Sequence, residues 1–142
     1  MNSLKASRAR RGFTLIELVV VVLVMGILAA VAAPKMFDTA SNAKINSTRQ
    51  SLVVVRDAIE LYKAQNGSYP GAAGSGSALQ NDLRNFLKGP FPKSSVPAAT
   101  SDGAVRYVTT GTGTGSVSGT TDWAYNTLDG SFTINTSGYE TL

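Results

Sequence analysis

Residues 13–33 have the sequence FTLIELVVVVLVMGILAAVAA, in which only Thr14, Glu17 and Gly26 are not apolar. At ~1.5 Å per residue, a helix of this length spans ~30 Å, the thickness of the hydrocarbon core of a bilayer. The residues before it include four basic side chains and no acidic one: Lys5, Arg8, Arg10 and Arg11. The positive-inside rule therefore predicts a single span whose N-terminal end stays in the cytoplasm while the remainder is exported.

Two simple interpretations leave part of this segment unexplained. A secretory signal peptide would account for the basic start, the apolar stretch and the small residues Ala30 and Ala32. However, Glu17 interrupts the stretch, and Pro34 lies where the mature chain would begin. A plain membrane anchor fits the length but gives no reason for Glu17, because a carboxylate inside a bilayer segment costs roughly 2.5–3.5 kcal/mol.

The residues around the start of the segment offer a third interpretation. Residues 10–17, RRGFTLIE, resemble the processing site of type IV prepilins and related pseudopilins, and the apolar run and Pro34 extend the similarity over residues 8–37. The rest of the chain matches this family in layout only. The resemblance implies that a membrane peptidase removes the leader, residues 1–12, by cutting between Gly12 and Phe13 and then N-methylates Phe13.

Glu17 acquires a role from this resemblance. In the family, the carboxylate at this position pairs with the N-terminal amine, here that of Phe13, on a neighbouring subunit. The simpler alternative is that Glu17 complements the helix dipole, which is worth ~0.3–1 kcal/mol and is smaller than the insertion cost. We therefore expect Glu17 to act in assembly.

The segment 13–34 is predicted to be first a transmembrane helix and then a filament-core helix. From Leu18 to Leu28 it is apolar on every face, which indicates burial on every face. Gly26 and Pro34 are expected to break this helix, since an internal proline costs ~3 kcal/mol. The break is either a simple kink or, as the resemblance implies, a site of local melting on assembly.

Beyond Pro34 the chain becomes amphipathic and predicts one helix from Thr14 to Gln65. A single stripe at three- and four-residue spacing contains Ile45, Thr48, Leu52, Val55, Ile59 and Tyr62. Asp57 and Glu60 lie off the stripe, and we interpret them as a solvated face or subunit contacts. A short second helix is predicted from a capping box at Ser77, after a flexible connection over residues 71–78.

Three alternating segments at 105–109, 123–125 and 131–134 predict strands, and residues 109–121 predict a long exposed turn. We expect Trp123 to be a core residue, packed across a hairpin that turns at Asp129-Gly130. The fold class is therefore α+β and pilin-like. One long N-terminal helix packs on a small C-terminal antiparallel sheet, within an extracytoplasmic domain of residues 35–142.

The composition excludes several kinds of function. The chain has 142 residues with no cysteine and no histidine, so disulfides, thiolate metal sites and Ser-His or Cys-His catalysis are excluded. From residue 13 onward nine basic residues balance nine acidic ones, which argues against nucleic-acid binding. No catalytic constellation is present, and we expect the protein not to be an enzyme.

Metal binding is the remaining cofactor question. The resemblance implies a calcium-binding loop in the C-terminal region for some members of the family. The weak candidates are Asp122, Asp102 and Asp129, but they form no acidic cluster in the sequence, so we expect no cofactor. Asp102-Gly103 and Asp129-Gly130 are equally typical of turns.

The sequence thus predicts a structural filament subunit, most simply a type II secretion pseudopilin. Its expected partners are further copies of itself, the prepilin peptidase/methyltransferase, the inner-membrane assembly platform and minor pilins. Its expected location is the bacterial inner membrane, then a periplasmic or surface filament. The alternatives are a small cysteine-free type IV pilin for motility, adhesion or DNA uptake, a single-span anchored binding module, and a secreted protein cut near Ala32.

Overall fold

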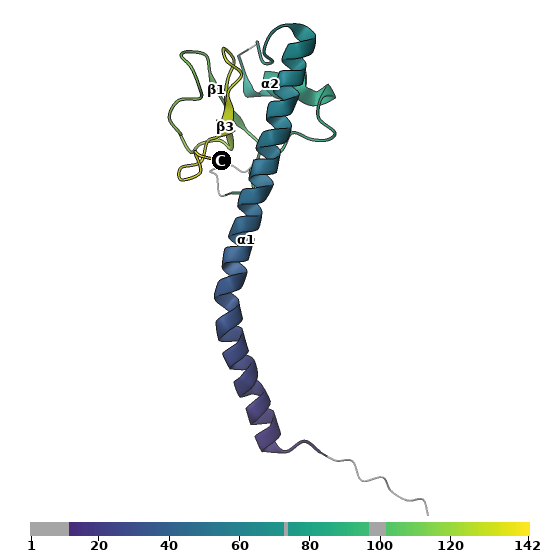
Figure 1. Cartoon of the computed structure of the whole chain (residues 1–142), viewed down its shortest axis with the longest axis vertical. Helices are drawn as coiled ribbons and strands as arrows, with labels where there is room; N and C mark the ends of the chain where they lie inside the picture. The colour runs from purple at the N-terminus through teal and green to yellow at the C-terminus, as the bar shows by residue number, and fades with distance from the viewer. Residues whose placement is uncertain (1–11, 73, 97–101) are drawn as a thin grey trace, which may run out of the picture. The chain divides into compact units, whose positions relative to one another are not determined.

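The computed structural model describes residues 12–72, 74–96 and 102–142 (Figure 1). Its elements follow one another as α1 (Leu15–Asn66), α2 (Gly76–Asp82), the 3-10 helix η1 (Leu83–Asn85), β1 (Val105–Val108), β2 (Trp123–Asn126) and β3 (Phe132–Ile134). The predicted α+β layout of one long helix and a small sheet is confirmed. The chain forms two compact units, residues 1–39 and 40–142, and their boundary falls inside α1.

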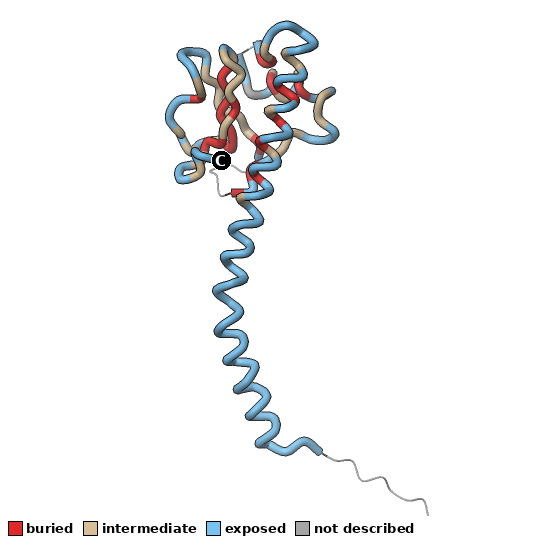
Figure 2. The backbone as a smooth tube through the Cα atoms, in the orientation of Figure 1, coloured by how far each residue is buried: buried red, intermediate tan, exposed pale blue. Residues whose placement is uncertain are grey.

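In the first unit, every described residue is exposed (Figure 2). The helix continues through Gly26 and Pro34 without interruption, so any break there is limited to a kink. A proline removes one backbone hydrogen bond, and the bonds of the neighbouring turns suffice to hold the helix together. Local melting on assembly stays a prediction.

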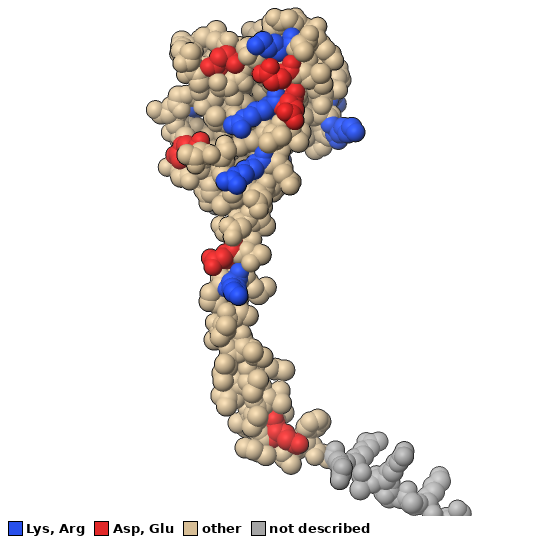
Figure 3. Space-filling model, in the orientation of Figure 1, with Lys and Arg blue, Asp and Glu red and all other residues tan. Residues whose placement is uncertain are grey.

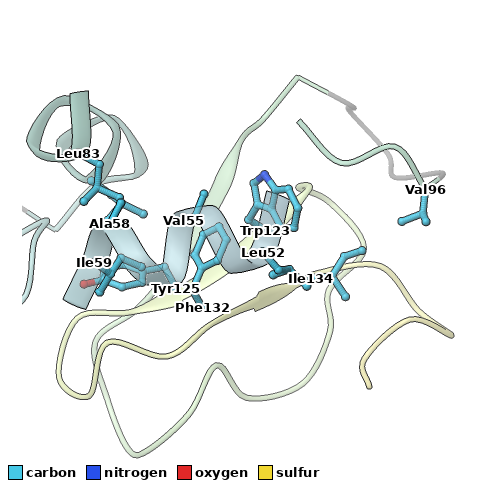
Figure 4. Packing of buried hydrophobic residues seen from close by; sticks show 11 residues of the cluster. Leu52, Val55, Ala58, Ile59, Leu83, Val96, Trp123, Tyr125, Phe132 and Ile134 are labelled. Carbon is cyan, nitrogen blue, oxygen red and sulfur yellow. The ribbon is translucent and has the colours of Figure 1, made fainter. Parts of the chain in front are cut away.

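In the second unit, the predicted apolar stripe of α1 is confirmed as one wall of the core. Leu52, Val55 and Ile59 are at most 1% exposed and share one core with Trp123, Tyr125 and Phe132 (Figure 4). Burial of each such side chain contributes ~1.5–3 kcal/mol. The Trp123 ring is also held in place because its Nε1 donates to the Pro92 carbonyl at 2.9 Å. The prediction that Trp123 is a core residue is confirmed.

The sheet has the order β1-β2-β3 and is mixed. The β2–β3 hairpin is antiparallel, as predicted, and it pairs Trp123 with Ile134 and Tyr125 with Phe132. The β1–β2 pair is parallel, so the prediction of an entirely antiparallel sheet is wrong. A parallel pair needs a connection of about a dozen residues that returns the chain to the same end. Residues 109–122 supply this connection without a helix. A helix between two strands is the usual sequence signal for a parallel pair, and here that signal is missing.

This connection is not the freely exposed turn that its Thr, Gly and Ser content indicates. The guanidinium of Arg106 on β1 donates through Nη2 to the carbonyls of Thr114 (2.7 Å) and Ser116 (2.8 Å). Asn126 and Asn135 are fully buried and bind the loop backbone from the other strands. Polar side chains from the sheet therefore supply the order that the loop's own residues do not.

The second helix also begins differently from the prediction. Its N-cap is Ser75, which has an extended backbone and accepts a hydrogen bond from the Ala78 amide; Ser77 lies inside the first turn. The predicted capping box at Ser77 is therefore wrong by two residues. The preceding connection is tied down, because the Gly71 amide donates to Asp82 Oδ2 at 2.7 Å.

Candidate functional site

The predicted cleavage bond lies in an accessible, non-helical part of the chain. Gly12 and Phe13 precede the first residue of α1, and the Phe13 side chain is 90% exposed. A peptidase needs its substrate bond outside regular structure, where the backbone can enter an active site. The geometry at Gly12 and Phe13 is therefore compatible with cutting. The remaining leader residues lie outside the described residues.

Immediately after this bond, Thr14 and Glu17 form a reciprocal cap on α1. The Glu17 carboxylate accepts from the Thr14 amide at 2.8 Å and from the Thr14 hydroxyl at 2.9 Å, both at Oε2. The Glu17 amide in turn donates to Thr14 Oγ1 at 3.3 Å. This is a capping box of the Thr-x-x-Glu type. The Thr-x-x-Glu motif is visible in the sequence, although only a subunit contact and the helix dipole were considered for Glu17 from the sequence.

The cap changes how Glu17 should be understood. In the uncut chain it satisfies backbone groups at the helix start, so its presence costs less than an unpaired carboxylate would. Cutting at Gly12 would create a cationic amine on Phe13, one residue before the cap. The N-terminal end of a helix is electropositive, so a cation there is unfavourable without a carboxylate nearby. Because both side-chain bonds use Oε2, the other oxygen, Oε1, has capacity to accept from a second donor.

The helix that follows presents a long apolar surface. Between Glu17 and Lys35 there is no charged residue, and Figure 3 shows a stretch of α1 on which no Lys, Arg, Asp or Glu is coloured. The large apolar side chains here are strongly exposed, for example Leu18 at 62% and Leu28 at 63%. Among the described residues, α1 is the one helix long and apolar enough to cross a membrane. Surfaces of this kind need a cover, either lipid or protein.

The three aspartates considered for calcium each accept hydrogen bonds from backbone amides. Asp122 is fully buried, and its Oδ2 accepts from Ser94 at 3.0 Å and Gly103 at 2.9 Å. Its Oδ1 is buried without a hydrogen bond in the described structure. Oxygen Oδ1 of Asp102 accepts from the Ala104 amide at 2.8 Å.

Asp129 closes the hairpin turn. It accepts from the amides of Gly113 and Ser131, and these two hydrogen bonds lower the pKa of its carboxyl group. Over the ranges 12–72, 74–96 and 102–142, no three acidic side chains gather at a point that could hold a metal ion. The carboxylates act in turns and loop attachment.

Comparison with known families identifies the N-terminal segment. The family described as the prokaryotic N-terminal methylation motif matches residues 7–33. This match includes the Gly12–Phe13 bond, the Thr14–Glu17 cap and the apolar run. The resemblance to type IV pilins and pseudopilins is thereby confirmed. Fold and site together have a pilin-like layout, with a methylation-type N-terminus, one long helix and a small mixed sheet.

Several curated relatives of this chain carry the name type II secretion system core protein G. The Pseudomonas aeruginosa protein of that name is 36% identical over 83 residues, covering 58% of this chain and 54% of the relative. The Vibrio cholerae protein is 30% identical over 95 residues (63% and 65%), and the Escherichia coli K12 protein is 31% identical over 67 residues (47% and 46%). The chain spans about half the length of the curated relatives it matches. No solved structure matches it significantly.

Proposed function

We propose that this chain is a structural subunit of a pilus-like filament, and specifically a pseudopilin of type II secretion. It is cut between Gly12 and Phe13, N-methylated on Phe13, and polymerised through the first half of α1. The observation that carries the proposal is the arrangement in residues 12–33. An accessible Gly-Phe bond directly precedes a capped helix whose apolar side chains are exposed on every face.

Before assembly, lipid covers this helix. The basic leader keeps the N-terminal end in the cytoplasm, so the peptidase/methyltransferase acts there and residues 40–142 are exported to the periplasm. The transfer of aliphatic side chains from lipid into a filament is nearly neutral in free energy. Packing and charge pairing must therefore favour the assembled state.

The charge pair is formed by Glu17 of one subunit and the Phe13 amine of its neighbour. Each group is costly to hold unpaired away from water, and together they compensate one another. Within its own chain, Glu17 also caps the helix through Oε2. The subunit contact then uses the remaining oxygen, Oε1, and sets the axial register between neighbours.

The partners that follow from this role are the prepilin peptidase/methyltransferase, the inner-membrane assembly platform, minor pilins and further copies of this chain. The role is structural, not enzymatic, and the balance of charge after residue 12 gives no basis for nucleic-acid binding.

Intact-mass measurement and N-terminal sequencing of the protein from its own cells test the proposal. A chain that begins at methylated Phe13 supports it. A start near Ala33 would instead identify a secreted soluble protein. An uncut N-terminus, in a host with an active prepilin peptidase, would identify a single-span anchored module.

A further inference from the structure

The second half of α1 has an exposed apolar face opposite the core. In the described part of the second unit, four large apolar side chains are about half exposed or more: Val53 (54%), Val54 (50%), Leu61 (49%) and Leu128 (60%). The first three lie on α1. They are off the buried stripe that Leu52, Val55 and Ile59 form, so the chain's own core does not cover them.

Val53 and Leu61 belong to a row on α1 that also contains one positive and one negative side chain. Arg49, Val53, Asp57 and Leu61 follow one another at four-residue spacing and form a ridge along the helix. Arg49 and Asp57 are separated by eight residues, or ~12 Å along the axis. In the described chain, neither side chain is engaged in a hydrogen bond or ion pair. Both charges are therefore available to an external partner.

A row at four-residue spacing winds slowly around its helix. With 3.6 residues per turn, the direction changes by ~80° between Arg49 and Asp57. The half that carries Arg49 and Val53 therefore faces a different neighbour from the half that carries Asp57 and Leu61. Such a surface suits a heterologous contact, in which one half binds the other half of the next copy and the pattern repeats.

We infer that this ridge docks a second copy of the chain, parallel to the first and displaced by eight residues. In that register Arg49 of one copy lies opposite Asp57 of the next, and Val53 lies opposite Leu61. Charged groups meet charges of opposite sign, and apolar groups meet apolar groups. The ridge is complementary to itself, and it lies on the same helix as the proposed assembly segment. Both features favour a second copy over an unrelated partner.

Charge reversal tests the electrostatic half of this inference, which rests on the proposed function. Arg49→Asp and Asp57→Arg are each made in the full chain, in cells that carry the assembly machinery, and filament yield is measured. Each single variant should lower the yield about tenfold, because like charges then meet. The double variant Arg49→Asp/Asp57→Arg should restore most of the yield. Thermal unfolding of each purified variant controls for folding.

Cross-linking tests the register. The chain has no cysteine, so Val53→Cys/Leu61→Cys supplies the only two thiols, and both native charges stay in place. A short bis-maleimide should give a ladder of trimers and larger species. Each single-cysteine variant, and the pair Val53→Cys/Leu128→Cys, should give no ladder. A product that stops at the dimer would indicate a closed antiparallel contact and overturn the inference.

The wild-type chain distinguishes failure of the proposed function from failure of the docking ridge. If wild type forms no filament under these conditions, the proposed function itself fails. If wild type and both single charge reversals form filaments equally well, the filament stands and the docking ridge is overturned. If the single variants fail and the double variant fails equally, the Arg49–Asp57 pairing is also overturned.

Discussion

The two halves of α1 share one backbone conformation but have different surroundings. Residues 15–39 are all exposed, although most of their side chains are apolar. Residues 40–66 bury one stripe against the sheet and expose the rest. The first half is apolar all round and the second half is apolar along a stripe. The pattern of side chains, not the helical backbone, thus decides whether the cover comes from the chain itself or from outside it.

The largest effect on stability should come from removing a central core side chain that packs against the second half of α1. Trp123→Ala should destabilise the second unit by ~3–5 kcal/mol, because the ring is completely buried against α1 and β3. Thermal unfolding by circular dichroism would measure this loss. Leu128→Ala, at an exposed position, is the matched control and should change little. Membrane insertion and cleavage should survive Trp123→Ala, since they depend on the first half.

Glu17→Gln should have the next largest effect, and only on assembly. Glutamine can still accept in a capping box, so the helix start is retained while the charge is lost. Filament yield should fall about 100-fold, which corresponds to the roughly 2.5–3.5 kcal/mol cost of an unpaired charge in the apolar segment.

Thr14→Ala is the complementary control, because it removes the hydroxyl that makes two of the three capping hydrogen bonds and keeps the charge. The charge-pair account requires it to assemble far better than Glu17→Gln. Equal loss in the two variants would show that capping alone explains the role of Glu17.

The helices and strands were largely predictable from sequence, since apolar period and turn residues are local signals. The extent of α1, the stripe around Leu52 and the β2–β3 hairpin belong to this group. The parallel β1–β2 pair was not predictable, because strand direction depends on the path of residues 109–122. That path is fixed by distant polar contacts from Arg106, Asn126 and Asn135, which leave no periodic trace in the sequence.

At the site, the cleavage bond and Glu17 were predictable from a contiguous motif. The Thr14–Glu17 cap was not predicted, although its Thr-x-x-Glu signal is present in the sequence. The cost of a carboxylate in a membrane segment directed attention to a partner from another subunit. The alternative of turn roles for the C-terminal aspartates agrees with the amide contacts of Asp102 and Asp129.

Asn135→Ala should have a smaller effect than Trp123→Ala on the second unit. The side chain accepts from the Ser118 amide at 2.9 Å and donates to the hydroxyls of Ser118 and Thr121. Its loss removes three part-buried hydrogen bonds to Ser118 and Thr121, at ~1–3 kcal/mol in total. Proteolysis of the 109–122 connection should accelerate in parallel. Asn85→Ala, an exposed amide, should match wild type in both measurements.

Asp129→Asn should change the pH dependence of stability. The hydrogen bonds to Asp129 lower the pKa of its carboxyl group below 3.8 in the folded chain. The resulting stabilisation is present above the unfolded pKa and is lost as pH falls through the folded pKa. Because the carboxylate is largely solvated, the variant should lose less than about 1 kcal/mol at pH 7. Unfolding curves of variant and wild type should converge as pH falls below the folded-state pKa of Asp129.

Calcium should have the smallest effect. The carboxylates of Asp122 and Asp129 already bind backbone amides, and no acidic cluster forms in the described residues. We predict that the melting temperature is the same in millimolar calcium and in EDTA. A clear stabilisation by calcium, lost in Asp122→Asn, would show that the C-terminal loops hold a metal ion.

In the proposed filament, the first half of α1 is covered from outside the chain, first by lipid and then by neighbouring subunits. The sequence has no cysteine, so Val24→Cys places a single thiol in this segment and Leu128→Cys places one on the exposed hairpin turn. Labelling with a membrane-impermeant maleimide is then measured in intact membranes and in isolated filaments. We predict that Leu128→Cys labels rapidly in both when the periplasmic face is open, and that Val24→Cys labels in neither. Equal labelling of the two thiols in filaments would contradict the account.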